Sequence, residues 1–305
     1  MPNGPTIRSA PGSIFARGSV HAAASRHLQE QDVQQALERI PSLPTVVTEI
    51  LRLARNEHST VGQLEKHLRE DMALAGRLLK LVNSSFYALP TRVSNLSQAV
   101  NLVGFSSLKS LALASAATGL LSLDVTAYGF APSGLWRHSL ATAVIGRRAA
   151  RLTGLGGEEA EEIFVACLLR DVGMAVLGPL MARERLVLVP GEDLITQERR
   201  VTGFDHCTVA GTIATRWNLP KDLGWILAHH HGDLTHEDPA MVRRVALVRL
   251  AERAANRSLV ALVEHHPFAN EVTPALLSSA GLSAETFAAL IAEVPTLITQ
   301  AAEAS

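Results

Sequence analysis

Apolar residues recur along most of this chain at intervals of three and four positions, and strand-like alternation between turns is nearly missing. This spacing is typical of amphipathic helices that turn one face toward a core. It predicts helices that begin near residues 43, 60, 71 and 95, followed by helices over 135–152, 158–169, 206–217, 223–231, 241–256 and 284–302. The expected fold is therefore all-α.

Polar residues at the expected helix ends support these boundaries. Thr60 and Gln63 have the spacing of an N-terminal capping box, and Asn95 with Gln98 marks another helix start. Gly104 is well placed to end that helix with a left-handed cap. The chain thus carries its own local signals for where several helices start and stop.

A stretch rich in Asp, Gly, Pro and Ser at residues 124–134 predicts a boundary between two helical units. We therefore expect a two-part helical bundle, with an N-terminal helical subdomain at 31–125 and a helical core at 134–260. Residues 1–30 lack the continuous apolar stretch of a signal peptide and are expected to form a flexible tail. Residues 261–305 are expected to add a C-terminal helical extension.

Composition and charge indicate where the protein is located and which classes of partner are disfavoured. The net charge of -1 gives no overall field that would recruit nucleic acid or an anionic membrane. The most apolar window, at 111–123, is too short to span a bilayer. The two cysteines, Cys167 and Cys207, fall inside helical patterns and are expected to be reduced thiols of a cytoplasmic protein.

Six residues that could bind a divalent metal lie on separate expected helices or at their ends. They are His138, Asp171, His206, His230, His231 and Glu252. Neutral imidazoles and carboxylates hold metals such as Fe, Mn or Zn in hydrolases, and a bundle can bring them together from several helices. Each also has a plainer interpretation, for example His138 as a hydrogen-bonded core residue. Three consecutive imidazoles at 229–231 point in three directions, so at least one should face inward.

Five segments are similar to motifs of the HDOD family, over roughly residues 35–260. They are Ile-Pro-Ser-Leu-Pro at 40–44, Asp71 with the segment 78–87, the segment 98–104, Leu-Trp-Arg-His-Ser at 135–139, and Trp-Asn-Leu-Pro at 217–220 with the histidines that follow. Met72 departs from the family, where a proline is usual. The resemblance implies a bacterial module with an HD-like helical core that relays signals through contacts with a protein partner.

Arg170 is the main departure from the related HD and HD-GYP phosphohydrolases. The resemblance places Arg170 and Asp171 at the His-Asp pair that names those enzymes, Glu252 at an aspartate, and Gly134 where many HD-GYP enzymes carry a glutamate ligand. A guanidinium stays protonated and has no lone pair for a metal. We therefore expect a degenerate, non-catalytic centre without a metal cofactor, in which Arg170 replaces the metal and pairs with Asp171 and Glu252.

Two alternatives remain open. In the first, a single Fe, Mn or Zn ion binds Asp171, His206, His230 and His231. The protein would then either hold a metal without turnover or be a metal-dependent phosphohydrolase that acts on a nucleotide or cyclic dinucleotide. No Gly-Tyr-Pro follows the histidines to support the cyclic dinucleotide version. A DNA-binding regulator is disfavoured, because the helix-turn-helix pattern at 95–121 offers Lys109 as its one basic residue. The sequence thus predicts a protein-binding signalling module without nucleic acid or membrane, and leaves its oligomeric state open.

Overall fold

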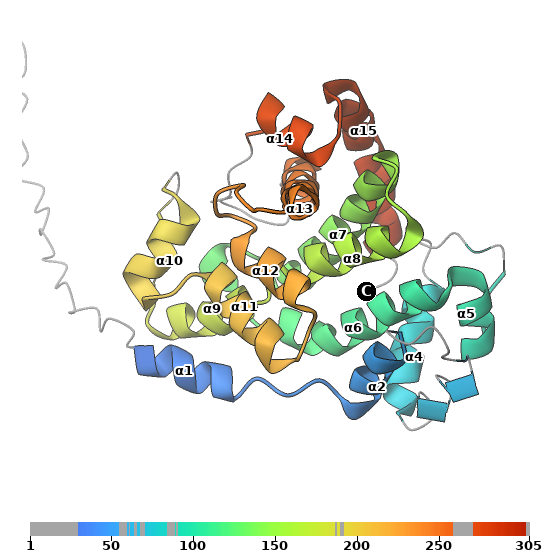
Figure 1. Cartoon of the computed structure of the whole chain (residues 1–305). Helices are drawn as coiled ribbons and strands as arrows, with labels where there is room; N and C mark the ends of the chain where they lie inside the picture. The colour runs from blue at the N-terminus through green and yellow to red at the C-terminus, as the bar shows by residue number, and fades with distance from the viewer. Residues whose placement is uncertain are drawn as a thin grey trace, which may run out of the picture.

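The computed structural model describes residues 30–54, 60, 62–63, 66–67, 71–83, 89, 91–186, 188–189, 192–258 and 271–302. Over these residues the chain is a bundle of helices without a β-strand, so the expected all-α fold is confirmed (Figure 1). The flexible tail expected at 1–30 lies outside the described residues except for Glu30, and so do the family segment 84–87 and the start of the expected extension, 261–270.

The first part of the bundle packs around one long helix. Its helices are α2 (Thr45–Ala54), α4 (Met72–Val82), α5 (Leu96–Val103) and α6 (Phe105–Leu121), and α6 contacts α2, α4 and α5. Helix α1 (Glu30–Glu38) packs instead on α9 (Met174–Arg183) of the second part. The expected caps are present, since the side chains of Asp71 and Asn95 accept hydrogen bonds from the backbone N–H groups of Leu74 and Gln98. Thr60 and Gln63 form both bonds of a capping box, although most of the helix expected after them lies outside the described residues.

Gly104 ends one helix and begins the next in a conformation different from the one expected. Its φ of 82° is positive, as a glycine cap requires, but its ψ of 164° is extended instead of left-handed helical. The chain therefore turns sharply between α5 and α6, and α6 starts at once. A side chain at this backbone geometry would be strained, so the position favours glycine.

The second part of the bundle carries the remaining helices. They are α7 (Gly134–Leu152), α8 (Gly157–Leu169), α9 (Met174–Arg183), α10 (Leu194–Thr202), α11 (His206–Arg216), α12 (Lys221–His229), α13 (Pro239–Ser258), α14 (Pro274–Ala280) and α15 (Ala284–Ala302). Every helix predicted in this part is present within a few residues. Three were not predicted, because α9 contains Pro179, α10 is mostly polar and α14 is only seven residues long.

Helices α7, α8 and α13 form the centre of the second part, and α15 packs across α7 and α13 (Figure 1). The two parts also meet, since α6 packs on α8. The division into units at 31–125 and 134–260 stays a prediction. The residues between them are not loose, because Val125, Tyr128 and Phe130 are buried.

The stretch Gly157–Arg183, which joins α8 and α9, is long and apolar enough to cross a membrane by length and composition. Two bent helix pairs pass the same test only when each pair is counted as one span. In the bundle, 89% of the most apolar window of Gly157–Arg183 is buried. Packing inside the protein therefore accounts for its apolar character.

Candidate functional site

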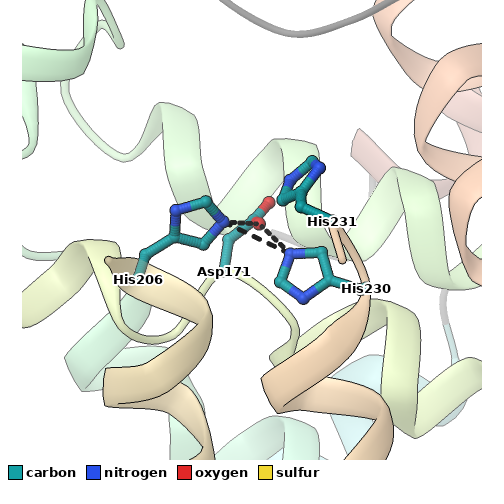
Figure 2. A group of neighbouring side chains, drawn as sticks. All are labelled: Asp171, His206, His230 and His231. Carbon is teal, nitrogen blue, oxygen red and sulfur yellow. Dashed lines mark hydrogen bonds and ion pairs between the residues drawn. The ribbon is translucent and has the colours of Figure 1, made fainter. Parts of the chain in front are cut away.

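The candidate ligands converge where the ends of α8, α11 and α12 meet. Figure 2 shows Asp171, which follows α8, with His206 at the start of α11 and His230 and His231 after α12 directed toward it. One donor atom from each of these four residues lies within 4.8 Å of the others. Asp171, His206 and His230 are completely buried.

Arg170 fills the space on the other side of Asp171. Its Nη2 lies 2.6 Å from Asp171 Oδ2 and 3.0 Å from His138 Nδ1, and its Nε lies 3.6 Å from Glu252 Oε1. Nη1 donates a hydrogen bond of 2.7 Å to the carbonyl of Cys167. Burial opposes the charge, but Asp171 and Glu252 outweigh it and raise the pKa of Arg170 above its ordinary value. The contacts expected between this guanidinium and the two carboxylates are thus present.

Both ring nitrogens of His138 are engaged. Nε2 lies 2.7 Å from Asn256 Oδ1, which can only accept, so Nε2 carries the proton and Nδ1 accepts from Arg170. Burial and the neighbouring guanidinium lower the pKa of His138 to about 4. In this arrangement His138 holds Arg170 in place and has no lone pair for a metal.

We expect His138 to stay neutral, with its proton on Nε2, through the pH range in which free histidine titrates. Because an unfolded histidine takes up its proton near pH 6.5 and folded His138 only near pH 4, this residue lowers the free energy of unfolding as the pH falls across that interval, by about 3 kcal/mol in total. Nitrogen NMR of histidine-labelled protein measures both the tautomer and the titration. The denatured protein is the control, and a folded-state titration near pH 6.5 would contradict this prediction.

The other two buried imidazoles point their Nε2 atoms at one spot. His206 Nδ1 lies 2.8 Å from Glu198 Oε2, and His230 Nδ1 donates to the carbonyl of Leu227 at 2.9 Å. Their Nε2 atoms are 3.3 Å apart and lie 3.7 Å and 3.5 Å from Asp171 Oδ1. Such an Nδ1–H contact to a carboxylate or carbonyl is the usual way in which a metal-binding imidazole is oriented.

This arrangement fits a cation. Two Nε2 atoms 3.3 Å apart cannot both carry a proton between them, and buried Asp171 Oδ1 accepts no hydrogen bond. Two buried carboxylates, Asp171 and Glu252, face the guanidinium of Arg170, and a third, Glu198, contacts the ring of His206. When both imidazoles are neutral, a divalent ion on Asp171 Oδ1 and the two Nε2 atoms would offset this negative charge and would supply Lewis-acid chemistry when bound.

The same surroundings also attract protons. Burial disfavours imidazolium, yet Cys207 and Glu198 hold the pKa of His206 well above its usual value, and Cys207 and Asp171 raise the pKa of His230 to about 9. Burial raises the pKa of Asp171, but Arg170 and the two imidazoles outweigh it and hold it well below its usual value. Asp171 is therefore an anion, and protons compete with any metal for the two Nε2 atoms.

The HDOD domain profile matches residues 40–232. The chain belongs to the HDOD family. An uncharacterized protein of Treponema pallidum (strain Nichols) is 26% identical to it over 234 residues, which is 72% of this chain and 44% of that protein. The chain therefore spans less than half the length of this curated relative.

Solved structures share the HDOD fold. An HDOD domain protein of unknown function from Geobacter sulfurreducens has a TM-score of 0.68 and 23% identity, covering 90% of this chain and 97% of that one. A Marinobacter aquaeolei protein provisionally named for signal transduction has a TM-score of 0.65 and 20% identity, over 90% and 65% of the chains. A Shewanella amazonensis protein provisionally named a phosphohydrolase has a TM-score of 0.62 and 20% identity, over 92% and 98%. At these identities the likeness establishes the fold.

The HDOD site contains residues that sequence reasoning missed. Buried Glu198 on α10 accepts hydrogen bonds from the Tyr128 hydroxyl at 2.5 Å and from the backbone of His206 at 3.0 Å, in addition to its contact with the ring. Asn256, which orients His138, was also not predicted as a site residue. The available signals were the Asp193-to-Thr196 cap of α10 and the i, i+4 spacing of Glu252 and Asn256, which share the apolar face of an amphipathic helix.

A surface pocket of about 1110 Å³ reaches the HDOD centre between α10, α11 and α12. Cys207 and His231 line its inner side, and His229 lines its rim. Of the three consecutive histidines, His230 and His231 face the centre, whereas His229 stacks on Trp225 at a ring distance of 4.3 Å. The pocket thus brings solvent to Cys207 and His231, which neighbour the buried ligands.

Proposed function

We propose that this HDOD protein is a signal-transduction output module that acts through contact with a protein partner, and that its HD-type centre does not hydrolyse phosphate esters. The observation that carries the second half is the buried guanidinium of Arg170 between His138, Asp171 and Glu252. The first half rests on membership of the HDOD family.

The loss of hydrolysis follows from how Asp171 is used. A two-metal clamp on a phosphoryl group needs a cation on each side of a shared ligand, with open positions for water and substrate. Here Asp171 Oδ2 is taken by Arg170 at 2.6 Å, and only Oδ1 faces the imidazoles. A guanidinium supplies charge but cannot bind and acidify a water molecule as a metal does.

The test is a hydrolysis assay of protein supplied in turn with Fe²⁺, Mn²⁺ and Zn²⁺. Wild-type protein should hydrolyse bis(p-nitrophenyl) phosphate, nucleotides and cyclic dinucleotides no faster than an Asp171→Asn variant, which keeps the shape of the side chain but removes its charge. Metal-dependent turnover by the wild type that the variant lacks would overturn the non-catalytic half of the proposal.

A second candidate function is a metal-dependent phosphohydrolase with a single ion. The geometry of Asp171, His206 and His230 and the pocket that reaches Cys207 favour it. It requires an ion with a free coordination position and measurable turnover, so the same assay separates the two functions.

The protein-contact half has its own test. Cross-linking in the source cells is expected to recover a discrete complex with one protein, under conditions that capture known assemblies. Recovery of DNA or RNA instead would contradict the proposal, which excludes nucleic acid and membrane as partners and places the module in the cytoplasm.

A further inference from the structure

Cys207 lies against the same two imidazoles as Asp171. Its Sγ is 3.7 Å from His206 Nε2 and 3.8 Å from His230 Nε2. The side chain is 3% exposed and lines the inner side of the pocket between α10, α11 and α12. The same two Nε2 atoms lie 3.7 Å and 3.5 Å from Asp171 Oδ1, a buried oxygen without a hydrogen-bond donor.

We propose that Cys207 is the fourth ligand of a closed, tetrahedral Zn²⁺ site completed by Asp171, His206 and His230. The proposal does not rest on the signalling function, because it concerns the kind of ion and its ligands. On binding, the thiol of Cys207 gives its proton to solvent and its sulfur bonds to the metal.

The separations agree with one tetrahedral ion. Two nitrogens about 2.1 Å from such an ion lie about 3.4 Å apart, and a nitrogen and a sulfur about 2.3 Å from it lie about 3.6 Å apart. The observed Nε2–Nε2 distance is 3.3 Å, and the two Sγ–Nε2 distances are 3.7 Å and 3.8 Å. Asp171 Oδ1 lies 3.5 Å and 3.7 Å from the same nitrogens.

His231 is the competing fourth ligand, since it also offers a donor atom within 4.8 Å of those of Asp171, His206 and His230. Its Nε2 lies 3.5 Å from Glu252 Oε1, on the side of Asp171 that holds Arg170. Cys207 Sγ instead lies against the two Nε2 atoms that converge on Asp171 Oδ1, at 3.7 Å and 3.8 Å, and this contact favours it as the fourth ligand.

The donor set has two chemical consequences. A thiolate is a soft ligand that favours zinc over the manganese or iron expected from histidine and carboxylate alone. Four protein ligands also leave no open position for water, which distinguishes structural zinc sites from catalytic ones. Such an ion would join the end of α8 to α11 and α12 as a cross-link.

Cobalt substitution tests the ligand directly. Protein loaded with Co²⁺ should show the intense visible bands of a tetrahedral site and a near-ultraviolet band from sulfur-to-cobalt charge transfer. The chain has only two cysteines, so Cys207→Ser should abolish the sulfur band, whereas the control Cys167→Ala should keep it. His231→Gln should keep it as well. A sulfur band that survives in Cys207→Ser, or folded wild-type protein that binds no Co²⁺, would overturn the proposal.

X-ray absorption at the zinc edge gives a measurement that needs no variant. Wild-type protein purified without chelator and loaded with one equivalent of Zn²⁺ should show one sulfur at about 2.3 Å and nitrogen or oxygen ligands at about 2.0–2.1 Å. A first shell of nitrogen and oxygen alone would contradict the role of Cys207. The hydrolysis assay is independent of this result, so the two proposals can fail separately.

Discussion

Replacing Arg170 by methionine is expected to lower the free energy of unfolding by about 3–5 kcal/mol. Methionine approximates the length and volume of the arginine stem but carries no charge. Asp171 and Glu252, which are 0% and 3% exposed, would lose the one guanidinium that faces them both, and His138 Nδ1 would lose its donor. Denaturant unfolding of protein treated with chelator measures the loss.

The exposed pair of Arg148 and Glu293 provides a matched control. It has two contacts of 2.7 Å and 2.9 Å, as short as those of Arg170, but both side chains are 40% exposed. Arg148→Met should therefore cost only about 0–1 kcal/mol. Equal losses for the two variants would show that the buried guanidinium is not what holds the centre together.

Gly173→Ala is expected to destabilise the protein by about 3 kcal/mol, because it pushes two chain segments apart. Gly173 lies two residues after Asp171, and an added Cβ would overlap the carbonyl oxygen of His206 and lie 2.8 Å from its carbonyl carbon. Neither atom belongs to a flexible side chain, so the start of α11 would have to move. Thermal or denaturant unfolding measures the loss.

Gly76→Ala on α4 is the control for this substitution. Nothing lies within 4 Å of the added Cβ, and the position is exposed in a helix. Alanine there should stabilise the protein by about 0.5–1 kcal/mol, since it costs less conformational entropy than glycine. If the two alanine variants had the same free energy of unfolding, the close approach of Gly173 to the backbone of His206 would not be important for stability.

Local features of the fold could be predicted from the sequence because their causes are local. Asp71 and Asn95 cap their helices through hydrogen bonds to residues three positions later, and such spacing is visible in the chain. The start of α11 at His206 follows from the same kind of cap by Asp205. Gly104 shows the limit of this reasoning, because its positive φ was expected and its extended ψ was not.

The centre depends on contacts that no local pattern encodes. Tyr128 meets Glu198 across 70 residues of chain, and His138 meets Asn256 across 118. The candidate ligands could be named by residue type, and Arg170 by the family resemblance. Which nitrogen of each imidazole is engaged, and that Cys207 faces two of them, depends on how the helices pack.

The two oxygens of Asp171 serve opposite sides of the centre, Oδ2 toward Arg170 and Oδ1 toward His206 and His230. Electron density drawn from one oxygen by a dication is lost to the other, so loading the histidine side weakens the attraction on the arginine side. Through His138, that attraction extends to α7 and, through Asn256, to α13. Through this one carboxylate, the presence of an ion beside the histidines would change how strongly Arg170 holds α7 and α13 together.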